Sequence, residues 1–168
     1  MVRSLAFRLP HLVKPTTRPF SLLNPSTRTH QNRIYDPIRT PSDLHTLLLL
    51  TASSNTPLIT LWTASFCSTC ASIKPRLTHM LQQEKIGEHE GGLAYAEVQM
   101  DSTLIGDLGV RYRISSLPTL MAFERMEAQF DDRLVRAEDM VGERGREWLV
   151  GRAIRGGRRG GGGGSMFG

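Results

Sequence analysis

The segment Leu58–Pro75 constrains the possible folds more than any other part of the chain. It opens with a short apolar run, Leu58–Trp62, which is typical of a buried strand, and Cys67 and Cys70 follow soon after it. A helical pattern comes next, so Cys67 lies where a strand turns into a helix. The free backbone N–H groups and the positive dipole end at a helix start favour an anion, and a thiolate at Cys67 would be stabilised there.

The spacing of the two cysteines is compatible with three kinds of chemistry. The thiols can close a small disulfide, attack another disulfide, or hold half of a tetrahedral metal site. A structural zinc ion needs four sulfur or nitrogen ligands, but the chain contains only two cysteines. None of the five histidines forms a second paired-ligand motif: His11, His30, His45, His79 and His89. Redox chemistry is therefore favoured over a metal site or an inert structural pair, and we expect no metal or other cofactor.

Charge is distributed unevenly along the chain. Residues 1–35 contain six basic residues and no acidic one, whereas residues 36–151 contain eleven basic and sixteen acidic residues. The net charge of +5 therefore belongs to the ends of the chain, and we expect no nucleic-acid partner. An acid-free segment that contains arginine, serine and threonine is typical of a mitochondrial transit peptide, with an ordinary disordered basic tail as the alternative. We expect a mitochondrial location, with the matrix favoured.

Length and composition predict one domain with a tail at each end. A chain of 168 residues with 39% hydrophobic content suffices for one modest core. We expect a disordered transit peptide at residues 1–35, the domain at 36–154 and a flexible Gly/Arg-rich tail at 155–168. No apolar run approaches the roughly 18 to 20 residues that a membrane-spanning helix requires. We therefore expect no membrane partner. We also expect a monomer.

Hydrophobic periodicity and turn signals predict alternating strands and helices. Strands are expected at residues 33–38, 58–62, 93–101, 120–124 and 129–135. Helices are expected at residues 41–52, after Cys67, at 103–109 and at 139–154, with Thr40 as the N-cap of the first. In the helix after Cys67, apolar residues recur at helical spacing and would face the sheet: Ile73, Leu77, Met80 and Leu81.

This order of elements, together with three local motifs, resembles the thioredoxin family. The motif Phe66-Cys-Ser-Thr-Cys70, with Lys74-Pro75 after it, is similar to the family's aromatic-Cys-x-x-Cys…Pro signature. The segment 111–123 resembles the one that carries the family's cis-proline, and the segment 97–101 is placed like the family's central strand that ends in aspartate. The resemblance covers about residues 34–154. It implies an α/β thioredoxin fold, in which a central mixed sheet of four or five strands has helices on both faces.

The resemblance also implies roles for individual residues. Cys67 would attack a substrate disulfide as a thiolate, and Cys70 would resolve the mixed disulfide. Pro118 would be cis and face the cysteines, which would leave the backbone of Leu117 free to pair with an extended substrate peptide. The alternative for Pro118 is an ordinary trans proline at the start of a strand. Phe66 would line the apolar rim of this substrate-binding site, with a place in the core as its alternative.

Four positions depart from the thioredoxin pattern. The family carries a buried aspartate six residues before the first cysteine, thought to help shuttle the proton of the inner thiol, and here that position is Leu61. Phe66 replaces the usual tryptophan, and Ser68-Thr69 replaces the usual Gly-Pro. Both thiols and the proline are present, so disulfide exchange is chemically possible. Glu97 is the nearest replacement for the carboxylate, but its place on an alternating strand can equally point it at solvent.

Together these features predict a thiol–disulfide oxidoreductase that exchanges disulfides with protein substrates and contributes to redox homeostasis. The family suggests a thioredoxin reductase, a flavoprotein that draws on NADPH, as the electron donor, with glutathione as the alternative. The missing aspartate and the altered Ser68-Thr69 pair support a second hypothesis. In that hypothesis the chain is a non-catalytic thioredoxin-fold module that binds or assembles partners in the mitochondrion.

Overall fold

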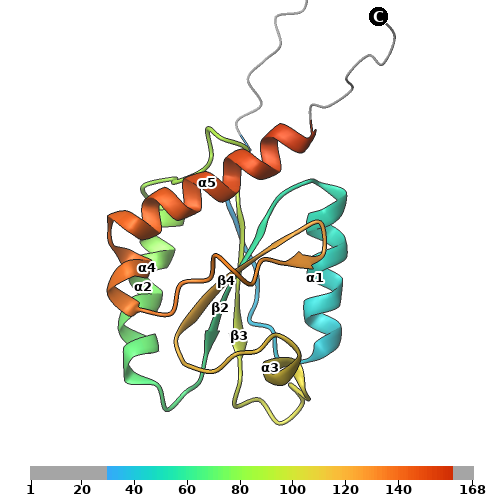
Figure 1. Cartoon of the computed structure of the whole chain (residues 1–168), viewed down its shortest axis with the longest axis vertical. Helices are drawn as coiled ribbons and strands as arrows, with labels where there is room; N and C mark the ends of the chain where they lie inside the picture. Colours follow the sequence, from blue (N-terminus) through green and yellow to red (C-terminus); the bar gives the residue numbers. More distant parts are fainter. Residues whose placement is uncertain (1–29, 161–168) are drawn as a thin grey trace, which may run out of the picture.

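Residues 30–160, which the computed structural model describes, form one sheet with helices on both faces (Figure 1). The strands are β1 (Arg33–Ile34), β2 (Leu58–Thr63), β3 (Ala94–Gln99), β4 (Thr119–Glu124) and β5 (Glu127–Ala128). The helices are α1 (Pro41–Ser53), α2 (Ser68–Gln82), α3 (Leu108–Arg111), α4 (Ala137–Val141) and α5 (Glu143–Gly160). Residues 1–29 of the predicted transit peptide and residues 161–168 of the predicted tail lie outside the described residues.

The strand order β1-β3-β2-β4-β5 makes the sheet mixed. β1 and β2 both run parallel to β3, whereas β4 is antiparallel to β2 and to β5. Trp62 lies opposite Thr119 in this register, and Leu61 lies opposite both Glu97 and Leu120. β2 and β3 therefore end at the same edge of the sheet at which β4 begins. The loops that follow β2 and β3 and the loop that precedes β4 meet at this edge.

The two faces of the sheet pack against different helices. Ile59, Leu61 and Tyr95 belong to a buried cluster with α2, α4 and α5, whereas Leu58 and Trp62 belong to a second cluster with α1 and α3. The predicted inward positions of α2 are all buried: Ile73, Leu77, Met80 and Leu81. The predicted α/β architecture, a mixed five-stranded sheet covered on both faces, is confirmed. Among residues 30–160, no helix combines the length and the apolar character that crossing a bilayer requires.

The first helix begins where the sequence predicts it. The Thr40 side chain accepts a hydrogen bond from the Asp43 backbone N–H at 3.1 Å, and an Asp43 carboxylate oxygen accepts one from the Thr40 N–H at 2.9 Å. This reciprocal capping box satisfies two backbone donors at the helix start. The hydrogen bond that the Arg39 backbone N–H donates lowers the pKa of the Asp43 carboxyl. Local sequence alone therefore specifies the start of α1.

The third helix is shorter than predicted and lies later in the chain. The sequence predicts a helix at residues 103–109, whereas α3 spans Leu108–Arg111. Gly106 adopts a left-handed conformation, with φ of +64°, and a right-handed helix cannot continue through such a residue. The segment before Gly106 therefore forms turns instead of a helix.

The fifth strand also differs from the prediction. The predicted strand at residues 129–135 is replaced by β5 at Glu127–Ala128. Arg125 and Met126 have positive φ angles and turn the chain tightly, so pairing with β4 begins immediately after them. Leu134 still forms an isolated antiparallel bridge to Leu120.

At the N-terminal side, the fold extends beyond the predicted domain limit at residue 36. β1 already pairs with β3, and the Asn32 side chain is held by three backbone groups. Its amide donates to the carbonyl oxygens of Leu81 and Ile86, and its oxygen accepts from the Leu93 N–H at 2.8 Å. The last residues of the predicted transit peptide are therefore part of the domain.

At the C-terminal side, the fold extends beyond the predicted limit at residue 154. The predicted helix 139–154 is two helices, because Gly142 adopts an extended conformation between α4 and α5. α5 then runs to Gly160. A Cβ atom on Gly156 would clash with Pro57, and one on Gly157 would clash with the backbone of Glu90. These glycines therefore allow α5 to pack closely, although their sequence suggests a flexible tail.

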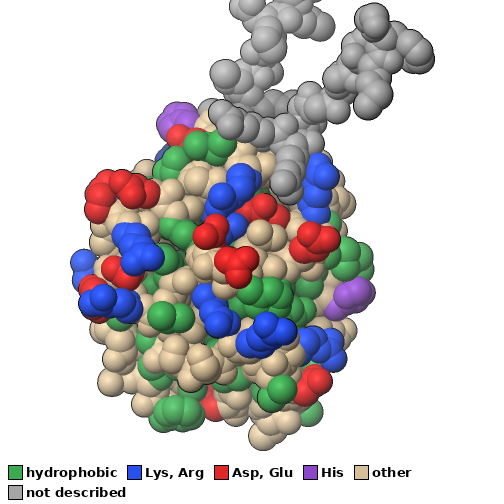
Figure 2. Space-filling model, in the orientation of Figure 1, with side chains coloured by type: hydrophobic (Ala, Val, Ile, Leu, Met, Phe, Trp, Pro, Cys, Tyr) green, Lys and Arg blue, Asp and Glu red, His purple; other side chains and the backbone are tan. Residues whose placement is uncertain are grey.

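A charged cluster joins α5 to the sheet. The Arg152 guanidinium is 1% exposed and donates to a carboxylate oxygen of Glu124 in β4 at 2.9 Å and to Asp132 at 2.8 Å. Arg155 reaches the same Glu124 oxygen at 3.2 Å. Figure 2 shows basic and acidic side chains close together on this face of the molecule. The cluster fixes α5 across one face of the sheet.

Candidate active site

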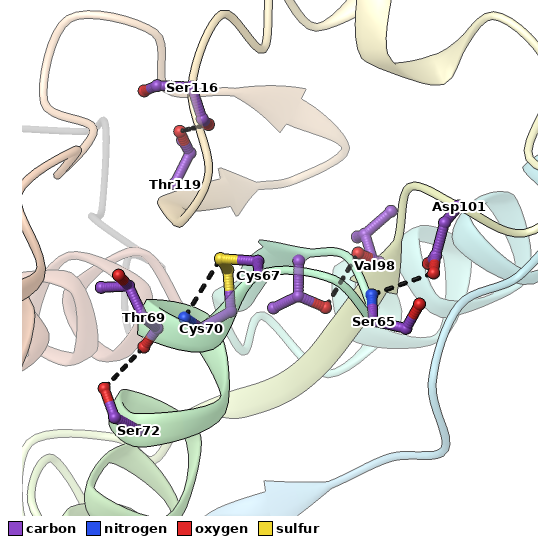
Figure 3. The surroundings of a disulfide bond; sticks show 10 residues. Ser65, Cys67, Thr69, Cys70, Ser72, Val98, Asp101, Ser116 and Thr119 are labelled. Carbon is purple, nitrogen blue, oxygen red and sulfur yellow. Dashed lines mark hydrogen bonds between the residues drawn. A yellow bond between two sulfur atoms is a disulfide. The ribbon is translucent and has the colours of Figure 1, made fainter.

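The two cysteines form a disulfide at the first turn of α2 (Figure 3). Their sulfur atoms are 2.04 Å apart and their Cα atoms 5.2 Å apart. Cys67 is the N-cap residue of the helix, and its Sγ accepts a hydrogen bond from the Cys70 N–H at 3.1 Å. A backbone donor and the helix dipole aimed at this sulfur favour its thiolate once the disulfide is reduced. The predicted position of Cys67, at a turn from strand to helix, is confirmed.

The two sulfur-bearing residues differ in their access to solvent. Cys67 is partly exposed, whereas Cys70 is only 2% exposed. A disulfide on another protein needs an accessible sulfur to react with, so Cys67 is the residue that a partner can reach. Cys70 can react with a sulfur that is already attached to Cys67. This difference in exposure is consistent with the predicted order, in which Cys67 attacks and Cys70 resolves.

Asp101 holds the loop that carries the first cysteine. Its carboxylate accepts a hydrogen bond from the Ser65 backbone N–H at 2.9 Å (Figure 3). The hydrogen bonds from Ser65 lower the pKa of the Asp101 carboxyl. The Cys67 N–H donates to the Ala64 carbonyl oxygen at 3.1 Å, which tightens the same loop. The turn that follows β3 therefore positions the loop between β2 and α2.

The loop before β4 lies beside the disulfide. Thr119, the first residue of β4 after this loop, is paired with Trp62 near the end of β2. The Thr119 side chain donates a hydrogen bond to the Ser116 carbonyl oxygen at 2.7 Å. Figure 3 shows Ser116 and Thr119 on the side of the disulfide that faces away from α2. The Leu117–Pro118 peptide bond is cis, as the resemblance implies, so the trans alternative is wrong. The Leu117 backbone makes no hydrogen bond to another described residue.

Phe66 lies on the surface next to Cys67. Its side chain is 80% exposed, so the alternative place in the core is wrong. An aromatic ring that is so exposed provides apolar area for a partner to cover. Its assignment to substrate binding, together with those of Leu117 and Pro118, stays a prediction.

A cavity of about 230 Å³ lies behind the disulfide, on the α2 side of the sheet. Its lining includes Cys70, Lys74, Glu97 and Asp101. The Glu97 side chain is 11% exposed, and its carboxylate lies 2.9 Å from the Lys74 ammonium. The sequence leaves open which way Glu97 points, and the structure directs it inward. Within residues 30–160, no group of three or more His, Cys, Asp or Glu side chains is arranged to hold a metal ion.

Comparison with known proteins finds similarity to thioredoxins. Probable thioredoxin-2 of Caenorhabditis elegans is 32% identical to this chain over 74 residues, which are 44% of this chain and 46% of that protein. The chain thus matches less than half the length of this relative. No family model matches the chain. The solved thioredoxin of Fasciola hepatica has a TM-score of 0.54 at 19% identity, and covers 71% of this chain and 98% of its own.

The reduced thioredoxin pre-protein of Schistosoma mansoni has a TM-score of 0.51 at 23% identity, and the match covers 66% of this chain and 96% of that one. The chain has a thioredoxin-like fold. The predicted thioredoxin fold is confirmed by these structural matches and by the topology of the sheet.

The candidate site contains two residues whose roles the sequence did not suggest. Lys74 follows Cys70 by one helical turn, a spacing that places both on the same side of α2, so the sequence carries a signal for it. Asp101 ends the motif that resembles the family's central strand, but its hydrogen bond to Ser65 joins residues 36 positions apart. No local pattern indicates such a contact. Leu61 is fully buried and apolar, so it cannot take part in proton transfer.

Proposed function

We propose that the chain is a thiol–disulfide oxidoreductase that reduces disulfides in other proteins. The observation that carries this proposal is the asymmetric cysteine pair at the start of α2. Cys67 is partly exposed and accepts a helix N–H hydrogen bond, while Cys70 is buried within bonding distance of it. This arrangement suits one thiol for attack on a foreign disulfide and the other for release of the product.

The reaction proceeds in two exchanges. The Cys67 thiolate attacks one sulfur of the substrate disulfide, which forms a mixed disulfide and releases the other substrate sulfur as a thiolate. The Cys70 thiolate then attacks the Cys67 sulfur, closes the Cys67–Cys70 bond and releases the second substrate thiolate. The substrate gains two electrons, and the cysteine pair loses them. A thioredoxin reductase or glutathione supplies the two electrons that open the pair for the next cycle.

The substrate docks at the edge of the sheet where the disulfide lies. The exposed Phe66 ring offers apolar contact, and the unpaired backbone of Leu117 offers hydrogen bonds to an extended peptide. Pro118, buried beside them, shapes the loop that presents this backbone. Protein segments that carry an exposed disulfide and little regular structure fit this surface.

Reduction of insulin disulfides by the full-length protein tests the proposed activity. We expect activity from the wild type with dithiothreitol as electron donor, and activity at the background level from Cys67→Ser. The matched control is Ser72→Ala, an exposed residue of the same helix outside the Cys-x-x-Cys motif, which should stay within about twofold of the wild type. Equal activity of the wild type and Cys67→Ser would refute the assignment of Cys67 as the nucleophile.

One observation favours a second candidate function, a module that binds partners without turnover. Leu61 removes the internal acid that thioredoxins place on this strand, and it is fully buried. A Cys70→Ser variant discriminates between the two candidates, because it traps a mixed disulfide with the substrate only if Cys67 attacks. Absence of a trapped species, together with absence of insulin reduction, would favour the binding module.

We also propose that the protein acts in the mitochondrion, with the matrix favoured, and contributes to redox homeostasis there. The support is the composition of residues 1–35, which carry six basic residues and no acidic one. An import receptor recognises segments of this composition. Residues 36–151 carry more acidic than basic residues, which is compatible with a soluble domain that is imported together with such a segment.

A further inference from the structure

The resolving step needs a proton acceptor close to Cys70. The nucleophile in disulfide exchange is the thiolate, so the Cys70 thiol must lose its proton before it attacks the Cys67 sulfur. Cys70 is 2% exposed, so bulk water has little access to this proton. A base inside the protein therefore has an advantage over solvent. The structure contains a carboxylate in a suitable place.

Cys70, Lys74 and Glu97 line one cavity. Cys70 and Lys74 lie one turn apart on α2, and Glu97 lies on β3 beneath that helix. The Glu97 carboxylate lies 2.9 Å from the Lys74 ammonium, which fixes its direction. The cavity has a volume of about 230 Å³. A water molecule occupies about 30 Å³ in the liquid, so the space can hold water that links the thiol to the carboxylate.

The strand register explains why Glu97 points into this cavity. Glu97 lies opposite Leu61, and paired residues of neighbouring strands face the same side of a sheet. Leu61 packs in the cluster beneath α2, so the Glu97 side chain must also lie on the α2 side. Leu61 itself offers no atom that can accept a proton. Glu97 is thus the carboxylate that the sheet directs under the helix of the two cysteines.

Other titratable groups around Cys70 are less suited to this role. Asp101 lines the cavity, but its carboxylate accepts the Ser65 N–H at 2.9 Å, and the hydrogen bonds from Ser65 lower its pKa, which makes it a weaker base. Tyr95 precedes Glu97 by two residues on the same face, and burial raises the pKa of its hydroxyl, so it stays protonated. Lys74 is a cation that donates, and Cys67 is bonded to the substrate at this stage. Glu97 is the remaining acceptor among the described residues of this cavity.

We propose that Glu97 accepts the proton of Cys70 through water in this cavity, and that Lys74 is a positioning residue that orients the carboxylate. The inference rests on the proposed oxidoreductase function, and it concerns only its second exchange. The proton moves from the Cys70 sulfur to the Glu97 carboxylate while the Cys70–Cys67 bond forms. The bond from Cys67 to the substrate breaks, and the substrate sulfur leaves with the electron pair. Glu97 then returns its proton to solvent.

Ellman's reagent, an aromatic disulfide, separates the two exchanges in the full-length reduced protein. Attack by Cys67 releases one coloured aromatic thiolate and leaves the other on its sulfur; resolution by Cys70 releases the second. In stopped-flow absorbance, we expect Glu97→Gln to slow the second release at neutral pH by about tenfold or more, since general-base catalysis commonly contributes this much. The first release should change by less than about twofold. At high pH the difference should shrink, because hydroxide replaces the internal base.

Four further variants make the result specific. Glu97→Asp keeps a carboxylate and should recover part of the second rate, and Lys74→Met should slow the second release with little effect on the first. Glu147→Gln makes the same chemical change on the exposed side of α5 and should match the wild type in both phases. Asp101→Asn should leave the pH dependence of the second release in place. If Glu97→Gln does not fold, the first and second release rates of Lys74→Met still test the proposal.

The outcomes that overturn the proposal are distinct from those that overturn the function. If Glu97→Gln leaves the rate of the second release unchanged, Glu97 is not the proton acceptor. The same conclusion follows if the pH dependence of the second release is lost in Asp101→Asn instead. In both cases the proposed exchange chemistry is unaffected. Absence of the first release in the wild type would overturn the oxidoreductase function and this inference together. Equal slowing of both phases in Glu97→Gln would indicate a structural role only and would also refute the proposal.

Discussion

The buried arginine of α5 offers a direct test of what holds the last helix to the sheet. Arg152 is 1% exposed, and its partner Glu124 is 8% exposed. Its guanidinium also lies 5.0 Å from the centre of the Trp148 ring. Replacing Arg152 with methionine keeps most of the aliphatic volume but removes the charge. Glu124 would then remain buried, and Arg155, which is 44% exposed, would still contact it.

The expected cost follows from the burial of the pair. Removing one partner of a buried ion pair usually costs about 3–5 kcal/mol, because the other charge is left without compensation. Arg155 still reaches Glu124 at 3.2 Å, so we expect the lower end, about 3 kcal/mol of unfolding free energy for Arg152→Met. At roughly 4 °C per kcal/mol for a domain of this size, the melting temperature should fall by about 12 °C.

Urea unfolding of the full-length oxidised protein measures this difference. The control is Arg155→Met, which removes an exposed partner of the same carboxylate and should cost less than about 1 kcal/mol. The double variant Arg152→Met/Glu124→Leu should lose less stability than Arg152→Met alone, since it leaves no uncompensated charge. If Arg152→Met and Arg155→Met lose equally little, the buried pair does not anchor α5 and the reasoning from burial is wrong.

Two further predictions concern pH and location. Hydrogen bonds lower the pKa of Asp101 in the folded protein below its ordinary value of 3.8. The ionised Asp101 therefore stabilises the fold at pH values above 3.8, and this stabilisation is lost as the pH falls through the lowered pKa of the folded state. The urea midpoint of the wild type should therefore exceed that of Asp101→Asn at neutral pH and approach it in acid; a constant difference would contradict this. For location, the fluorescently tagged full chain should enter mitochondria. Arg3→Gln/Arg8→Gln should weaken import, whereas the matched charge change Arg158→Gln/Arg159→Gln should not, and equal import of both variants would contradict a targeting role for residues 1–35.

Features that depend on neighbours in the chain were predictable. The capping box at Thr40, the helix start at Cys67 and the inward face of α2 each depend on residues within about one or two helical turns. The cis peptide at Pro118 followed from a motif of adjacent residues that resembles the thioredoxin family. These features need no knowledge of how distant segments pack.

Features that depend on distant segments were not predictable in the same way. The glycines near residue 156 suggest a flexible end when they are considered alone, yet they fit against Pro57 and Glu90 and let α5 continue to Gly160. The alternation of β3 assigns Glu97 to one of two faces without saying which face α2 covers. That choice follows from the pairing of Glu97 with Leu61 and from Lys74 on the helix above.

Local patterns in the chain thus specified where the cysteines lie and which helix carries them, because capping and periodicity act over a few residues. Long-range packing specified what surrounds them. The carboxylate behind Cys70, the support of the cysteine loop by Asp101 and the limits of the domain all depend on contacts between residues far apart in the chain. A single sequence contains no short-range signal for such contacts.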